Sequence, residues 1–484
     1  MAHKLLFIFI LTSTILQGCS TNPVTGRKDF VLITESQEIA QGKSYHQQVL
    51  KQYRIYRDQE LQNYVTRLGE EIAAKSHRSQ LAFRFFVLDS PEVNAFAVPG
   101  GYIYITRGIL AYMNSEAELA GVLGHEIGHV TARHSVRQQA TSTFTNMLSE
   151  ILLSGSGGSA LAGNLINIAG SALTQGYGRE HELEADRLGA EYLAKTGFDP
   201  HLMIDVVGIL KNQEEFEKVR AKAENRKSRI YHGVFSSHPD NDKRLQEVVA
   251  AAKIFKNKQN RSIKEKEFLN RINGMTYGPS VREGVIRENT FYHPDLGFVI
   301  SLPKDWRYSN QKSRLLAEHK SKEAFWQLTA KKLDKKISPT EIINTLSKNK
   351  AKNIKVINNG SIRGATAIMP AKTSWGTRNS RVTVHIFKNQ AYIILAAAKT
   401  DAQFKQLDAE FLRAGKSFHT MSAAEKSQAK PQRIKIVSAK STDTYKSLAS
   451  TSVINKHALE KLRLLNDMFP TGQPANGQLI KIIH

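Results

Sequence analysis

The side chains best suited to chemistry lie at two places, and the first is the run His125-Glu126-Ile127-Gly128-His129. Two histidines four positions apart lie on one face of a helix. In that arrangement two neutral imidazoles can hold one Zn²⁺ ion. Glu126 follows the first histidine and can reach a water bound to the metal. The spacing therefore predicts a zinc site with Glu126 beside it.

The second place is the run Glu180-His181-Glu182-Leu183-Glu184-Ala185-Asp186-Arg187. A catalytic zinc needs three protein ligands and one open position. Glu182 and Asp186 are four apart and share a helix face, whereas Glu184 points elsewhere. Glu182 is therefore the predicted third ligand, and Asp186 is predicted to accept a hydrogen bond from a ligand histidine and fix its tautomer. Taken alone, this run is more typical of an exposed charged helix with i,i+4 ion pairs, and the first motif is what favours the metal site.

Sequence patterns predict that both runs lie on helices, with strands nearby. Ser115 is a candidate N-cap, with Glu118 as its capping-box partner, for a helix that contains the first motif. A second helix is predicted from Arg179 to about Lys195. Residues 81–88 are predicted to form a strand, and residues 94–106 to form two short strands around a turn.

With both runs identified, residues 20–255 resemble the gluzincin metallopeptidase family of the CAAX prenyl protease and HtpX type, in its exported BepA-like branch. The runs Asn22–Arg27 (NPVTGR) and Asn94–Gly101 (NAFAVPGG) add to the resemblance. It implies one zinc ion per chain, held by His125, His129 and Glu182, with Glu126 as general base for hydrolysis of peptide bonds. It also implies an edge strand that lines the cleft and pairs with an extended substrate, formed by Asn94, Ala95, Phe96 and Ala97.

Two later residues enter through the same resemblance. His238, in Ser236-Ser237-His238-Pro239, is by composition an ordinary loop histidine. The family pattern of His-Pro followed by arginine makes His238 a candidate fourth ligand that restrains activity. It also makes Arg244 a candidate support for the metal ligands.

The N-terminus has the pattern of an export signal. Lys4 precedes a short apolar run, and Leu16-Gln17-Gly18-Cys19 resembles a bacterial lipobox. Residues 1–18 are thus a predicted signal peptide, and Cys19, the chain's one cysteine, is the predicted lipidation site. Ser20 after the cysteine resembles the pattern of lipoproteins sorted to the outer membrane, so we expect an anchor on its periplasmic face. The alternative is an incidental cysteine after an ordinary signal.

Patterning along the chain predicts a multidomain α+β protein. The family resemblance implies that residues 19–280 form a mainly α-helical zincin protease domain with a short edge-strand sheet. Residues 285–420 are expected to form an α+β domain of unknown role, whose opening resembles small modules of the PsbP and Mog type. Residues 421–432 are linker-like. The uncharged segment 151–173 is expected to be a flap, with a membrane span as the alternative.

Residues 433–484 read as strand, helix, helix, strand and resemble a divergent LysM module, a type that binds peptidoglycan. A small stabilising domain without a ligand is the alternative. The net charge of +24 favours anionic neighbours such as lipid headgroups or wall polymers. Nucleic acid is not expected, because no arginine-rich stripe with interleaved aromatics is present.

The expected function is that of a zinc metalloendopeptidase acting on misfolded or misassembled envelope proteins. The rival interpretations are an envelope chaperone and a glycan-binding lipoprotein, each with a latched zinc site.

Overall fold

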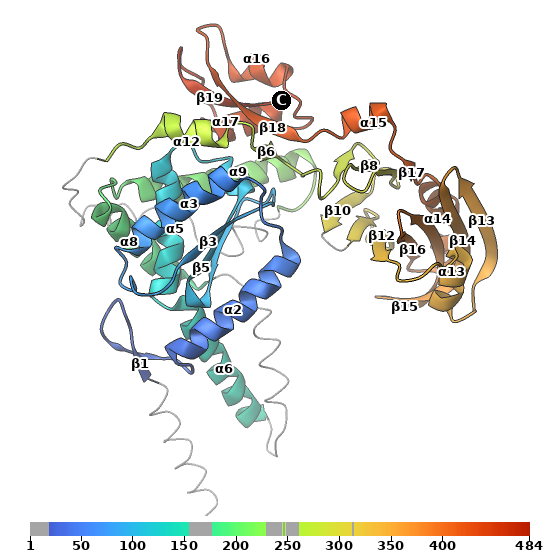
Figure 1. Cartoon of the computed structure of the whole chain (residues 1–484), viewed down its shortest axis with the longest axis horizontal. Coiled ribbons are helices and arrows are strands. Elements are labelled where there is room, and N and C mark those ends of the chain that lie inside the picture. Colours follow the sequence, from blue (N-terminus) through green and yellow to red (C-terminus); the bar gives the residue numbers. More distant parts are fainter. Residues whose placement is uncertain (1–18, 154–176, 229–243, 245–246, 248–260, 312–313) are drawn as a thin grey trace, which may run out of the picture. The chain divides into compact units, whose positions relative to one another are not determined.

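The computed structural model describes residues 19–153, 177–228, 244, 247, 261–311 and 314–484 (Figure 1). The chain divides into two compact units. Unit 1 combines Met1–Gly278 with Gln432–His484, and unit 2 is Pro279–Pro431. Among the described helices, none combines the length and the hydropathy needed to cross a membrane.

Unit 1 is built mainly from helices, with three small sheets among the described residues. Its sheets have the orders β1-β2, β3-β5-β4 and β19-β18-β6. Its described strands and 3-10 turn are β1 (Cys19–Thr21), β2 (Lys28–Phe30), β3 (Arg84–Leu88), β4 (Ala95–Val98), η1 (Pro99–Gly101), β5 (Tyr102–Thr106), β6 (Thr276–Tyr277), β18 (Gln432–Ser438) and β19 (Leu479–Ile483). Its described helices are α2 (Glu35–Gln52), α3 (Gln59–Ala73), α4 (Arg107–Leu110), α5 (Glu116–Thr131), α6 (His134–Leu153), α8 (Arg179–Lys195), α9 (Leu202–Ala223), α12 (Glu265–Ile272), α16 (Tyr445–Ser450) and α17 (Ala458–Leu465).

Helix α5 is the central element of unit 1. Its N-cap is Ser115, as expected, whose hydroxyl accepts the Glu118 backbone N–H at 3.1 Å. The Glu118 carboxylate accepts the backbone N–H of Asn114 at 2.8 Å. All of α5 except Glu118 is buried, among apolar side chains from α3, α8 and α9. Such burial holds the helix and both histidines in one place.

Glycines set how closely α5 and α8 approach. A Cβ added to Gly128 would lie 3.0 Å from the Ala185 backbone oxygen, and one added to Gly189 would lie 3.2 Å from the His125 backbone nitrogen. Both distances are tighter than ordinary packing, so larger side chains would force the helices apart. The close approach brings the carboxylate run on α8 next to the histidines on α5.

The C-terminal segment of the chain is part of unit 1. Strand β18 pairs with both β19 and β6, with Gln432 opposite Tyr277. Ile434, Tyr445, Leu462 and other apolar residues of this segment belong to the same core cluster as α5. Lys481 is fully buried, and its ammonium donates to the backbone oxygens of Ala111 and Met113 at 2.8 and 2.7 Å. This segment therefore braces the loop that leads into α5.

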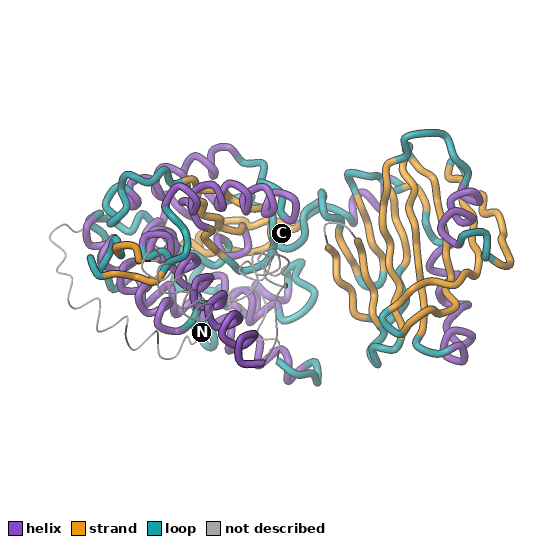
Figure 2. Tube along the Cα trace, turned by 90° about the horizontal axis from the view of Figure 1, so that it is seen from below, coloured by secondary structure: helices purple, strands orange, loops and turns teal. Residues whose placement is uncertain are grey.

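Unit 2 is a seven-stranded antiparallel sheet of order β10-β11-β12-β16-β15-β14-β13, accompanied by a four-stranded sheet of order β17-β9-β8-β7 (Figure 2). Helix α14 packs against one face of the larger sheet in a core that includes Trp326 and Phe411. Helix α13 packs against the other face, over Val382 and Val384. Its described elements are β7 (Val285–Arg287), β8 (Thr290–His293), β9 (Phe298–Ser301), β10 (Arg307–Gln311), β11 (Arg314–Glu318), β12 (Ala324–Lys332), α13 (Pro339–Ser347), β13 (Lys352–Asn359), β14 (Ile362–Thr373), β15 (Gly376–Phe387), β16 (Gln390–Ala398), α14 (Asp401–Lys416), β17 (His419–Thr420) and α15 (Ala423–Gln428). Residues 421–432, expected as a linker, thus contain α15 and the start of β18.

Candidate metal centre

Three buried side chains on α5 and α8 converge on one point. The Nε2 atoms of His125 and His129 lie 3.0 Å apart, and the Glu182 carboxylate lies 3.5 and 3.4 Å from them. These ligand atoms all lie within 4.8 Å of one another. Two imidazole nitrogens and one carboxylate are the donor set of catalytic zinc sites that keep one position open. The three residues therefore fit a zinc ion.

The first ligand histidine is held from behind by two further residues. His125 Nδ1 lies 2.7 Å from Asp186 Oδ1, which leaves Nε2 for the metal. Arg244 donates from Nε and Nη2 to both Asp186 oxygens, at 2.8 and 2.7 Å, and its Nη1 lies 3.2 Å from Glu182. Burial disfavours the Asp186 carboxylate, but Arg244 and His125 outweigh burial and lower the pKa of Asp186 below its ordinary value. The structure thus brings Asp186 and Arg244 together beside His125 and Glu182.

The second ligand histidine is held by residues that the sequence left unassigned. His129 Nδ1 lies 2.8 Å from Nδ1 of His134, and His134 Nε2 lies 3.0 Å from Glu184 Oε2. Arg137 donates to the same Glu184 oxygen at 2.8 Å. Glu184 does point away from the metal position, as expected, but it points at His134.

The backbone explains why the sequence did not reveal His134. Five residues along a continuous helix, His134 would lie on a different face from His129. Helix α5 ends at Thr131, and Arg133 takes a left-handed conformation with φ of 55° before α6 begins. This break turns His134 back toward His129. In the sequence, the one sign of this role was a histidine that follows closely after the end of the predicted helix.

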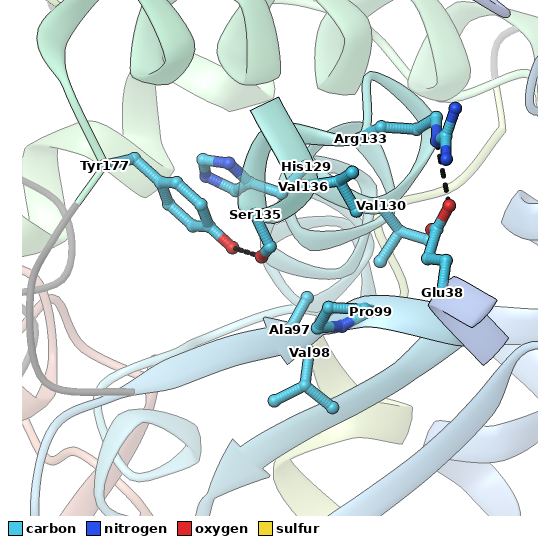
Figure 3. A pocket seen from close by; sticks show the side chains of 10 residues that line it. All are labelled: Glu38, Ala97, Val98, Pro99, His129, Val130, Arg133, Ser135, Val136 and Tyr177. Carbon is cyan, nitrogen blue, oxygen red and sulfur yellow. Dashed lines mark hydrogen bonds and ion pairs between the residues drawn. The ribbon is translucent and has the colours of Figure 1, made fainter. Parts of the chain in front are cut away.

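A small cavity lies beside His129, between the edge strand and α6 (Figure 3). Ala97 and Pro99 face it, whereas Val98 points away (Figure 3). The Tyr177 ring stacks on His129 with centroids 4.0 Å apart, and its hydroxyl lies 2.7 Å from Ser135 Oγ. The cavity offers about 10 Å³, roughly the space of one water molecule.

The remaining predicted site residues lie as follows. Glu126 is buried on α5 next to His125. Ala95, Phe96 and Ala97 belong to β4, which follows Asn94 and closes one edge of its sheet. The backbone of Cys19 begins β1. His238 lies outside the described residues, as do residues 1–18 and most of the 151–173 segment.

Comparison with known proteins agrees with this geometry. Residues 59–252 match the model of peptidase family M48. The Beta-barrel assembly-enhancing protease of Yersinia pestis is 32% identical over 237 residues, which are 45% of this chain and 48% of that protein. The Mitochondrial metalloendopeptidase OMA1 of Arabidopsis thaliana is 31% identical over 153 residues, which are 31% of this chain and 30% of that protein. The M48 match and these names support a zinc metallopeptidase, and the chain spans about half the length of the first relative.

Among solved structures, that of the cyanobacterial PsbP from Synechocystis sp. PCC 6803 matches with a TM-score of 0.23 and 12% sequence identity. The match covers 28% of this chain and 95% of that protein. The M48 match covers the two helices of the metal centre, α5 and α8, as well as β4.

Proposed function

We propose that the chain is a zinc metalloendopeptidase that cleaves misfolded or misassembled proteins of the bacterial cell envelope. The observation that carries this proposal is the buried cluster of His125, His129 and Glu182 beside the edge strand β4. A bound zinc ion would supply a Lewis acid that acidifies water and polarises a peptide carbonyl.

Glu126 is the proposed general base. It follows His125 on α5, so the helix fixes it on the same element as two ligands. It accepts a proton from the attacking water and returns the proton to the leaving amine nitrogen. Asp186 and Arg244 keep the His125 ring in the orientation that presents Nε2 to the metal.

Strand β4 is the proposed substrate-binding edge, through Asn94, Ala95, Phe96 and Ala97. The support is that β4 pairs with β5 in its sheet and lines the same small cavity as His129. An extended polypeptide can add to such an edge through backbone hydrogen bonds, with little dependence on side chains. That mode suits unfolded substrates of varied sequence. The Yersinia relative, by its name, enhances β-barrel assembly, which favours outer-membrane proteins as the substrate class.

Chelation separates proteolysis from the rival chaperone function. We expect 1,10-phenanthroline to stop the cleavage of unfolded casein by the full chain, because it removes the metal. Added Zn²⁺ should restore cleavage, because the chain keeps its three metal ligands. The measurement is release of soluble peptide, with aggregation of the substrate followed in parallel. Suppressed aggregation with no zinc-dependent cleavage would favour the chaperone.

The anchor belongs to the proposal as well. Cys19 is the proposed lipidation site, which would hold the chain at the periplasmic face of the outer membrane. We expect Cys19→Ala to move the protein from the membrane fraction to the soluble periplasmic fraction, since one residue carries the lipid. The matched control is Ser20→Ala. An unchanged membrane fraction for Cys19→Ala would remove the anchor from the proposal.

Residues 433–484 are the proposed contact with peptidoglycan. The support is their resemblance to LysM modules and the order strand, helix, helix, strand of β18, α16, α17 and β19. A pull-down of the full chain with isolated peptidoglycan tests this contact.

A further inference from the structure

A chain of hydrogen bonds runs outward from the second ligand histidine. It passes from His129 through His134 to Glu184, with distances of 2.8 and 3.0 Å. His129 and His134 are fully or almost fully buried, and the Glu184 side chain is 17% exposed. Buried polar groups in series restrict one another's protonation states, so the position of each proton in this series of hydrogen bonds can be assigned in turn.

One assignment of protons satisfies every step. If Nε2 of His129 holds a metal, its Nδ1 carries the proton and donates to His134 Nδ1. His134 must then accept at Nδ1 and carry its own proton on Nε2. That proton is donated to Glu184 Oε2. A doubly protonated His134 would set two N–H groups against each other at 2.8 Å.

The surrounding groups favour the same assignment. The Glu184 oxygen that lies 3.0 Å from His134 Nε2 also accepts a hydrogen bond from Arg137 at 2.8 Å, so both neighbours treat it as an acceptor. Arg137 also lies 3.5 Å from Asp29 on β2. The outer end of this series of hydrogen bonds is thus a carboxylate that Arg137 holds in place.

We propose that His134 is a positioning residue, held by Glu184, that fixes the tautomer and ring orientation of the metal ligand His129. The two ligand histidines then have different supports. His125 contacts a carboxylate directly, whereas His129 reaches one through a second imidazole. This inference rests on the metal site of the proposed function, but it concerns metal binding rather than peptide cleavage.

Zinc affinity of the full chain, measured by competition with a chromogenic chelator, tests the proposal. His134→Leu removes the acceptor, and we expect affinity to fall about 10- to 100-fold, as for other supports of ligand histidines. His134→Asn restores an acceptor oxygen near the position of Nδ1, and we expect affinity within about 3-fold of the parent protein. The matched control is His181→Leu, because the His181 ring stacks on His134 at 4.4 Å without entering the hydrogen-bond chain.

The outer link provides a second test if His134→Leu does not fold. Glu184→Leu should weaken zinc binding roughly 3- to 10-fold, and Glu184→Gln should recover it, because an amide oxygen still accepts the His134 proton. The proposal is overturned if His134→Asn or Glu184→Gln binds zinc as weakly as the corresponding leucine variant. It is also overturned if His181→Leu weakens binding as much as His134→Leu, or if the leucine variants bind like the parent. A chain that binds zinc in this pattern but cleaves nothing would refute the proposed function alone.

Discussion

Replacing Glu126 with glutamine is expected to abolish cleavage of a denatured substrate while the chain keeps its zinc. Glutamine has the size of glutamate but cannot take a proton from water. General base catalysis typically contributes about 100- to 10,000-fold, so the rate should fall by at least that much. The measurement is casein cleavage together with zinc content by atomic absorption.

The matched control is Glu180→Gln, which makes the same change at an exposed position on the helix that carries Glu182. It should leave both the rate and the zinc content unchanged. Full activity in Glu126→Gln would refute the assignment of the base. Loss of zinc in that variant would instead give Glu126 a role in metal binding.

A second large effect is expected from removing the C-terminal segment of unit 1. Truncation after Pro431 takes Ile434, Tyr445, Leu462, Leu465 and Ile483 out of the core that holds α5. Each such side chain contributes about 1.5–3 kcal/mol by burial. Their combined loss is on the order of 10 kcal/mol, which is comparable to the whole stability of a domain. We therefore expect the truncated chain to lose cooperative thermal unfolding and to bind no zinc.

Unit 2 should be dispensable for the fold of unit 1, although unit 2 is much longer than the C-terminal segment. It enters the chain between β6 and β18, whose residues Tyr277 and Gln432 are paired neighbours in an antiparallel ladder. Replacing residues 278–431 with Asn-Gly would close that ladder as a two-residue hairpin. We expect this shortened chain to keep its zinc and to unfold cooperatively near the parent's temperature.

Thermal unfolding of both shortened chains, followed by circular dichroism, tests which segment the fold of unit 1 requires. If the truncated chain melts like the parent, residues 432–484 are not part of the core. If the hairpin chain fails to fold, unit 2 supports unit 1 in a way that its insertion point does not indicate. Because truncation is expected to unfold unit 1, surface substitutions are the cleaner way to test whether this segment binds peptidoglycan.

Much of the local structure could be predicted from residue order. The N-cap at Ser115, the helix from Arg179 to Lys195 and the strands on either side of Pro99 all occur where expected. Each depends on interactions within a few residues, such as a capping hydroxyl or the period of the apolar side chains. The placement of Glu182 and Asp186 on one face of α8 follows from the same helical period.

Other features depend on contacts between distant parts of the chain. Local patterns place strands in residues 433–484, but they do not show that β18 joins β6 across 154 intervening residues, or that Lys481 reaches the loop before α5. Strand pairing at that separation is set by the complete core, which no short window of sequence contains.

The motif from His125 to His129 shows most clearly which features follow from local sequence and which follow from tertiary packing. The sequence by itself determined two histidines and a glutamate at helical spacing and a second helix with a matching carboxylate, because a helix fixes which side chains share a face. Only the tertiary structure decided what holds His129. The left-handed turn at Arg133 and the close packing of α5 against α8 bring His134 and Glu184 behind it. A change of backbone direction and the distance between two helices are set by packing, which helical periodicity does not record.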